Sequence, residues 1–263
     1  FKKNLNQKPY TKQIIEQFGD LIITSYGIDI LVKENDTSDT NKSINIREDG
    51  EKRIVFDIAF LKIKGSEGKR GFWISESEIS YGQFAEFIKK SKYKSSGKWD
   101  LYYKNESYKN YPVIDVSFED AMAFCNYITK ESGLQISLPT YEQWKQAACI
   151  DKSIYTWGDD WEIDAVNSGL KEFDGESFIN NNKGTLQSIT FLRDVSLYGV
   201  RHLNGNVSEW CLDEKKGNAN FRLVAGGSWK IKNENEARSD YYYYEKVTTL
   251  SDDLGFRVVI NDK

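Results

Sequence analysis

Helical periodicity stops near residue 150, and this break constrains the fold more than any other feature of the chain. From there to Trp229, glycine, asparagine, aspartate and aromatic residues dominate. Long segments without regular structure are uncommon in compact domains unless function, bound ions or buried aromatic rings hold them. The chain has 7 Trp and 16 Tyr but only 3 Pro, so we expect an ordered domain whose loops are held by aromatic side chains.

Three short helices are predicted before the break, and each begins with a capping box, in which a Ser or Thr is followed three residues later by Gln or Asp. The pairs are Ser80 with Gln83, Ser117 with Asp120 and Thr140 with Gln143. Strands are expected at 53–64, 71–75, 222–225 and 255–260, from β-branched and aromatic content. Helices followed by a loop region and terminal strands favour an α+β fold.

Two parts of the chain differ in character. Residues 1–51 are predicted to form an N-terminal extension, with a short helix at 10–18, a strand or hairpin at 21–33 and a polar linker at 34–51. Residues 52–263 are predicted to form the main domain.

Composition excludes several partners. The net charge is −4 and no long basic block occurs, so we expect neither nucleic acid nor an anionic membrane as a partner. No apolar run reaches the ~20 residues of a membrane span. The sequence opens without a basic-then-apolar signal, so a targeting segment is expected to be absent or already removed. The compartment stays open, with periplasm or cell surface favoured over cytoplasm, and the oligomeric state is not indicated.

Seven segments, taken in order, carry a family resemblance. They are FWISESEISYGQFAEFI (72–88), YPVIDVSFEDAMAFCNYI (111–128), GLQISLPTYEQWKQAA (133–148), YTWGDD (155–160), YGVRHLNGNVSEWCLD (198–213), AGGSW (225–229) and LGFRVV (254–259). Together they resemble the formylglycine-generating enzyme, or sulfatase-modifying factor, family. The resemblance implies a C-type-lectin-like α+β fold with few short helices, small twisted antiparallel sheets and long ordered loops, often with calcium.

The redox chemistry of that family is expected to be missing. Its oxidases hold copper(I) with two cysteines shortly after Gly-Gly-Ser, and Ile231 and Glu236 stand at the matching positions here. A related branch holds iron with three histidines, whereas this chain has only His202. We therefore expect no copper, no iron and no catalytic residue. Ser228 has no nucleophile elbow around it, and its one possible base is His202.

Calcium is the ion that the resemblance leaves open. One family site maps onto the Gly205 and Val207 carbonyls, the Glu209 carboxylate and the side chain of His202, where the family has Asn or Asp. The other maps onto Asn167 and Asn180. Carboxylate, amide and carbonyl oxygens suit this ion. The alternative is an ion-free turn in which Glu209 accepts backbone N–H bonds.

A recognition surface is predicted at the position that forms the family's groove. Consecutive side chains diverge in a helix or a strand, so some of the four consecutive tyrosines should be exposed. Exposed Tyr with Asn, Ser and Arg is typical of binding surfaces, although single exposed aromatics are also normal. The predicted groove residues are Ser228, Trp229, Arg238, Tyr241, Tyr242, Tyr243 and Tyr244.

The leading hypothesis is a non-catalytic module that binds or assembles with a protein or peptide partner. One alternative is an oxidase or protein-maturation enzyme with an unplaced cofactor. The other is a variable ligand-binding protein of a diversity-generating retroelement, since such proteins place Tyr, Asn and Ser in the segment between Gly-Gly-Ser-Trp and Gly-Phe-Arg. Metal content and neighbouring genes would distinguish the three.

Overall fold

A computed structural model describes residues 21–24, 27–30, 47–48, 51–65, 70–103, 106–148, 153–168 and 193–261. The chain divides into two compact units, 1–42 and 43–263. In the first unit, β1 (Leu21–Thr24) and β2 (Gly27–Ile30) pair in antiparallel, which agrees with the predicted hairpin. The helix predicted at 10–18 lies outside the described residues.

The second unit begins earlier than the predicted boundary at residue 52. The reason is β3 (Arg47–Glu48), which lies in the segment predicted to be a linker but pairs with β4 (Lys52–Val55). The predicted single strand at 53–64 is wrong, because a tight turn divides it into β4 and β5 (Ile58–Ile63). Phe56 and Asp57 have φ of 53° and 60°, as a two-residue hairpin turn requires.

The larger sheet has six strands in the order β3-β4-β5-β6-β12-β7, all antiparallel. β5 and β6 (Phe72–Ser75) form its centre, β12 (Val259–Asn261) lies between β6 and β7, and β7 (Ile136–Ser137) forms one edge. β6 is buried along its whole length.

The smaller sheet has four strands in the order β10-β9-β8-β11. Its long hairpin joins β8 (Ser208–Lys215) to β9 (Asn218–Ala225), and β10 (Tyr242–Lys246) extends it. β11 (Leu254–Gly255) pairs with β8 in parallel. The sequence interpretation assigned 208–215 to loop and found only the end of β9, so it was wrong about this hairpin.

The three predicted helices are confirmed. They are α2 (Tyr81–Ser91), α3 (Phe118–Ser132) and α4 (Tyr141–Ala148). Ser80 and Ser117 cap α2 and α3 through reciprocal bonds with Gln83 and Asp120. At α4, Thr140 N donates to Gln143 Oε1 and Gln143 N donates to Thr140 Oγ1. Single-turn 3-10 helices lie at Trp99–Leu101, Glu106–Tyr108, Ile163–Ala165 and Glu234–Ala237.

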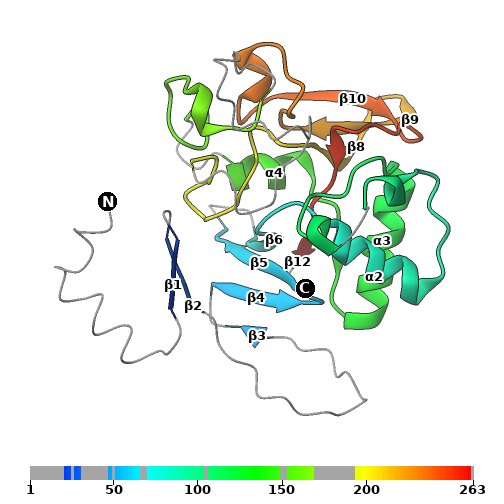
Figure 1. Ribbon diagram of the computed structural model, residues 1–263. Helices are drawn as coiled ribbons and strands as arrows, with labels where there is room; N and C mark the ends of the chain where they lie inside the picture. The colour runs from blue at the N-terminus through cyan, green and yellow to red at the C-terminus, as the bar shows by residue number, and fades with distance from the viewer. Residues whose placement is uncertain are drawn as a thin grey trace. The chain divides into compact units, whose positions relative to one another are not determined.

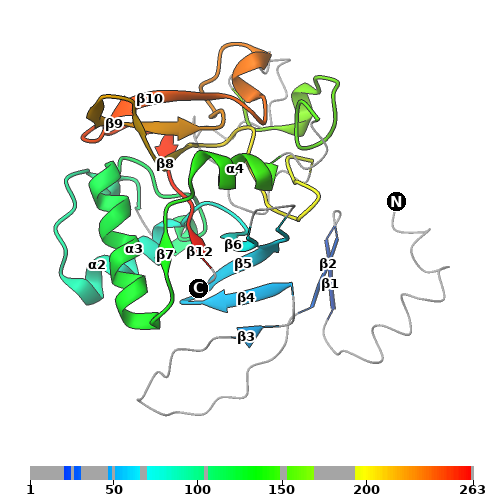
Figure 2. The ribbon, with the colours of Figure 1, turned by 180° about the vertical axis from the view of Figure 1, so that it is seen from behind.

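Helix α4 lies between the two sheets, and α2 and α3 pack together beside them (Figures 1 and 2). Trp144 of α4 packs in one apolar cluster with residues of both sheets, such as Ile74 and Cys211. The aromatic rings of Phe84, Phe124 and Phe256 join α2 and α3 to the chain before β12. No helix in the described part of the chain is long and apolar enough to cross a membrane.

The loops after residue 150 are held by aromatic rings and by one buried amide. Tyr155 stacks on Trp157 with ring centroids 4.8 Å apart, and both contact Trp161. Asn204 Nδ2 donates to the Ala237 carbonyl and to Ser239 Oγ, while its Oδ1 accepts from Thr156 N. The predicted role of aromatic side chains in ordering these loops is therefore seen at 155–161.

Candidate functional site

The four consecutive tyrosines divide between the two faces of β10 and its approach. Tyr241 lies 6.0 Å from Tyr243, and Tyr242 lies 6.0 Å from Tyr244, ring centroid to ring centroid. This alternation is what an extended strand imposes. Tyr242 is 46% exposed, so the expectation that some of the four face solvent is confirmed.

One face of β10 joins the start of α4 in an aromatic and basic surface. The ring of Tyr242 lies 4.9 Å from that of Tyr141, and Lys145 Nζ lies 5.9 Å from the Tyr141 ring. On the same side, Lys215 Nζ lies 5.7 Å from the ring of Tyr244. We call Tyr141, Lys145, Lys215, Tyr242 and Tyr244 the tyrosine-lysine surface. Tyr141 and the lysines were not predicted, because their contact with β10 joins segments distant in sequence.

The opposite face of β10 belongs mainly to the core. Tyr243 packs against the cluster that contains Trp210 and Val224, and burial raises its pKa. Arg238, another predicted groove residue, precedes β10 and forms an ion pair with Asp240, with Nε 2.9 Å from Oδ1. Tyr243 therefore acts chiefly as a packing residue.

The Gly-Gly-Ser-Trp turn forms a neighbouring but separate region. Ser228, a predicted groove residue, is buried and donates to Asp253 Oδ2 at 2.9 Å. Trp229 Nε1 donates to the Asp252 carbonyl at 3.1 Å, and Lys230 Nζ lies 5.0 Å from its ring. The predicted groove residues thus do not form one continuous lining.

Glycine is required within this turn. A Cβ at Gly227 would lie 2.6 Å from the carbonyl oxygens of both Asn204 and Glu236. Real Cβ atoms do not approach backbone oxygens so closely. Gly227 therefore allows the turn to pass between two other loops, and its presence reflects packing.

The two positions that match the family's copper ligands serve structural roles. Ile231 is buried in a small apolar cluster with Tyr155 and Ala237. Glu236 Oε2 accepts from Lys232 N at 3.1 Å, within the local turn. The described cysteines, Cys125 and Cys211, are buried, and burial raises both thiol pKa values. Thiolate chemistry is unfavourable at either one.

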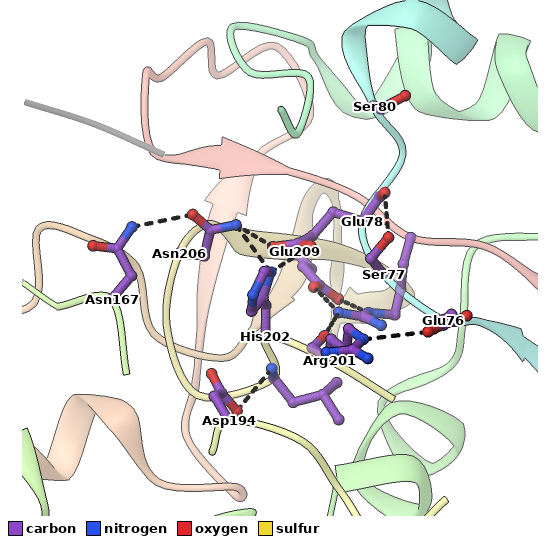
Figure 3. Close-up of polar contacts among 12 residues, drawn as sticks. Glu76, Ser77, Glu78, Ser80, Asn167, Asp194, Arg201, His202, Asn206 and Glu209 are labelled. Atoms are coloured by element: carbon purple, nitrogen blue, oxygen red, sulfur yellow. Dashed lines mark hydrogen bonds and ion pairs between the residues drawn. The ribbon is translucent and has the colours of Figure 1, made fainter. Parts of the chain in front are cut away.

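Glu209 lies at the centre of a buried ionic network (Figure 3). Arg257 donates from Nε to Glu209 Oε2 at 2.6 Å and from Nη2 to Oε1 at 2.7 Å. Trp144 Nε1 also donates to Oε2 at 2.7 Å. Burial raises the pKa of Glu209 and the Arg257 guanidinium opposes that shift. A bidentate Arg–carboxylate pair of this kind is geometrically specific.

His202 contacts a second buried carboxylate beside this pair. His202 Nδ1 lies 3.2 Å from Glu78 Oε2, and Asn206 Nδ2 donates to Glu78 Oε1 at 2.8 Å (Figure 3). Asn206 Nδ2 also lies 3.3 Å from His202 Nδ1. Burial opposes ionisation of Glu78, yet the contact with His202 and the charge of Arg257 lower its pKa. His202 Nε2 is buried and has no hydrogen-bond partner among the described residues.

A third carboxylate, Asp194, holds the loop on the other side of His202. Its Oδ1 and Oδ2 accept from Asn204 N at 3.3 and 3.0 Å, and Oδ1 accepts from Thr156 Oγ1 at 2.9 Å. Burial raises the pKa of Asp194, while His202 and these hydrogen bonds oppose the rise. No serine hydroxyl bonds to His202 within the described ranges, so the residues do not form a Ser–His relay.

These contacts do not fit a calcium site that uses Glu209. Both of its oxygens already bind Arg257, and a calcium ion there would face the guanidinium charge. Gly205 and Val207 are buried in the same turn, and Asn167 Nδ2 donates to Asn206 Oδ1 at 3.1 Å. The described residues contain no group of three or more His, Cys, Asp or Glu arranged to hold a metal. Asn180 lies outside the described residues, so calcium binding stays a prediction, without support from Glu209.

A polar cavity of about 250 Å³ lies beside this network, and sequence reasoning missed it. Glu76, Glu78 and Arg201 line it, together with polar groups near the start of α2. Glu76 is paired with Lys52 at 2.9 Å and with Arg201 at 3.2 Å. Glu76 and Arg201 bind one another, and Glu78 is held by His202 and Asn206. Asp57, which is exposed, also lines the cavity.

The fold and the site together define a C-type-lectin-like α+β domain with long ordered loops and an internally paired ionic core. The chain belongs to the sulfatase-modifying factor enzyme 1-like family, whose model matches residues 64–262. This agrees with the resemblance carried by the seven motifs.

Curated relatives include the inactive C-alpha-formylglycine-generating enzyme 2 of Bos taurus, 27% identical over 158 residues, and that of Mus musculus, 27% identical over 157 residues. Each match covers 56% of this chain, and 49% and 48% of the respective relative. The matched region therefore spans about half the length of these relatives.

Solved structures share the fold at low sequence identity. PvdO from Pseudomonas aeruginosa has a TM-score of 0.63 at 13% identity, covering 84% of this chain and 99% of its own. CarF has a TM-score of 0.59 at 20% identity, covering 74% and 87%. Treponema denticola variable protein 1 has a TM-score of 0.58 at 15% identity, covering 82% and 98%. The predicted fold class is confirmed.

Proposed function

We propose that this chain is a non-catalytic member of its family that binds a protein or peptide partner through the tyrosine-lysine surface. The observation that carries the proposal is the exposed ring of Tyr242, packed at 4.9 Å on Tyr141 beside Lys145. Tyrosine offers a large contact area at low entropic cost, which makes it frequent at recognition surfaces.

The chemistry of the described residues supports a binding role over an enzymatic one. Ile231 and Glu236 replace soft ligands, the described thiols are buried, and the buried carboxylates have partners of their own. The curated relatives named inactive are consistent with a family scaffold retained without its oxidase chemistry.

The test is a pull-down from cells that make the protein, comparing wild type with Tyr242→Ala. Leu197→Ala serves as the matched control, because Leu197 is 75% exposed and lies outside the tyrosine-lysine surface. We expect a specific partner to be lost with Tyr242→Ala and retained with Leu197→Ala. Equal recovery of the partner with both variants would show that the tyrosine-lysine surface does not bind it.

Metal analysis of the same preparation tests the non-catalytic part. Copper or iron at one equivalent per chain would overturn it, because such an ion would restore a redox centre. A partner lost with Tyr242→Ala from protein free of both metals would support the proposal in full.

A further inference from the structure

Strand β10 forms the end of the four-stranded sheet, and among the described strands it pairs only with β9 (Figures 1 and 2). Just outside its two ends, Gly226 N donates to the Tyr241 carbonyl and Val247 N donates to the Asn220 carbonyl. Bonded positions alternate along an antiparallel pair. Residues 241, 243, 245 and 247 therefore turn their backbone groups toward β9, and 242, 244 and 246 turn theirs away.

The outward backbone groups lack partners along most of the strand. No residue in the described ranges supplies a hydrogen bond to the backbone N–H or C=O of Tyr242 or Tyr244. Beyond them, the Lys246 carbonyl accepts from Thr249 N at 2.9 Å, where the chain turns away. The open part of the edge therefore centres on the two tyrosines that belong to the tyrosine-lysine surface.

The features that commonly protect an edge strand are few here. Proteins block such edges with proline, bulges, inward-pointing charges or covering segments. β10 contains no proline, and its register with β9 is continuous from Tyr242 to Lys246. Its two charges lie at the end of the strand, at Glu245, which accepts from Thr249 Oγ1 at 3.0 Å, and at Lys246.

We propose that the open edge of β10 binds an extended, acidic peptide segment as an added strand. The proposal rests on the proposed function and specifies the shape and charge of the partner. In such strand addition, backbone hydrogen bonds supply affinity and alternate side chains supply specificity. One row of the added side chains would contact Tyr242 and Tyr244, and the other row would lie on the face of Tyr241 and Tyr243.

The charge of the tyrosine-lysine surface identifies the occupant as acidic. Lys145 and Lys215 lie against tyrosine rings, and neither forms a salt bridge with a described residue. Lys246 occupies the same face of β10 as Tyr244. The nearby carboxylate of Asp240 is paired with Arg238 at 2.9 Å. Lys145 also lies near enough to lower the pKa of Asp240, and Glu142 lies near Tyr141. The positive charge available to carboxylate side chains at alternate positions is therefore that of Lys215 and Lys246.

The first experiment measures binding of a short, end-blocked peptide of alternating valine and glutamate by fluorescence anisotropy. In one control peptide lysine replaces glutamate, and in the other every amide is N-methylated, so that neither edge of the peptide can donate to β10. We expect the glutamate peptide to bind, and both controls to bind at least about tenfold more weakly. Equal binding of the methylated peptide would overturn strand addition, and equal binding of the lysine peptide would overturn the acidic preference.

The second experiment separates backbone from side chain at one position. Tyr244→Ala removes the ring but keeps the outward N–H, whereas Tyr244→Pro removes both and leaves the bonds with β9 in place. We expect Tyr244→Pro to weaken glutamate-peptide binding about three- to tenfold more than Tyr244→Ala does, since one hydrogen bond is lost. Thermal unfolding checks that both variants are folded. Binding of the N-methylated peptide to wild type tests the same backbone hydrogen bonds without changing the protein.

The outcomes also separate this proposal from the proposed function. If Tyr244→Pro matches Tyr244→Ala while Tyr242→Ala still loses its pull-down partner, strand addition fails and the binding surface stands. If Tyr242→Ala retains its partner, the proposed function fails. A dimer of wild type that becomes a monomer with Tyr244→Pro would overturn the peptide occupant, because the edge would then pair with a second copy.

Discussion

Glu209, Ala225 and Tyr242 lie side by side across β8, β9 and β10, on one face of the same sheet. Two strand spacings, about 10 Å, separate a carboxylate that is 1% exposed from a tyrosine that is 46% exposed. At Glu209 the side-chain oxygens have donors from Arg257 and Trp144. At Tyr242 the side chain is exposed, and the outward backbone groups have no hydrogen-bond partner among the described residues.

The difference shows how one sheet can combine rigidity with recognition. A buried charge is tolerated only when its partners are fixed. The side chains around Glu209 on β8 therefore have to keep one geometry. An edge strand with exposed aromatic rings keeps interactions available for a partner. Mutations should therefore damage stability on the β8 side and binding on the β10 side.

The largest effect is expected from Arg257→Met. Removing the guanidinium leaves Glu209 buried without its counter-charge, which typically costs about 3–5 kcal/mol of unfolding free energy. Urea denaturation measures the loss. Lys90→Gln, at the exposed pair with Glu86, is the control and should cost only about 0.5 kcal/mol or less. A loss below about 1 kcal/mol for Arg257→Met would show that the pair does not hold the core.

A smaller contrast is expected within β10 itself. Tyr243→Ala should cost roughly 2 kcal/mol, because this ring packs against the core. Tyr242→Ala should cost about 0.5–1 kcal/mol, since it loses mainly the contact with Tyr141. The same denaturation assay compares the two, and equal losses would remove the distinction between a packing tyrosine and a recognition tyrosine.

Asp120 provides a pH-dependent test of a cap that lies outside both regions. Burial disfavours its charge, but hydrogen bonds from Ser117 and Ser96 hold the pKa of Asp120 below the ordinary 3.8. The folded state therefore binds this proton less readily than the unfolded state does. The resulting stability is present above the unfolded pKa and is lost as pH falls through the folded value.

Asp120→Asn should cost about 1 kcal/mol near neutral pH, as loss of a cap does. The gap between wild type and variant should close as pH falls below about 4, because wild type then loses the same carboxylate. Denaturation curves over a pH series measure the gap. If the difference in unfolding free energy between wild type and Asp120→Asn persisted in acid, the cost would come from altered hydrogen-bond geometry and not from the lost charge.

The smallest expected effect is that of calcium. Both Glu209 oxygens bind Arg257, so millimolar calcium should move the Tm by less than about 1 °C relative to EDTA, whereas an ion at 100 times its Kd would add about 2.7 kcal/mol. Differential scanning fluorimetry with and without each additive measures this. A rise of several degrees would place calcium at backbone or amide oxygens elsewhere in the domain.

Local signals were sufficient to predict the helices. Ser80 and Ser117 lie within three residues of the partners that complete their capping boxes, and the apolar spacing that follows is equally local. The fold class followed from the order of the family motifs. These features need no knowledge of tertiary contacts.

The β8–β9 hairpin was missed because its burial breaks the pattern expected of a strand. Residues 208–211 of β8 are all buried, and they include the charged Glu209. Arg257, the partner of Glu209, is 48 residues away in sequence. Glu78 and His202, which also contact each other, are separated by 124 residues. Such pairings depend on packing, so the calcium hypothesis could not be tested from spacing alone.

The position of β12 has a consequence for how the domain is made. Residues 259–261 lie between β6 and β7 in the larger sheet, although they are translated after every other described strand. Until they leave the ribosome, β6 and β7 cannot be joined, and each nascent strand keeps an unpaired edge. Contacts of such long sequence separation slow folding. Synthesis therefore includes an interval in which the partly made domain is most exposed to misassociation.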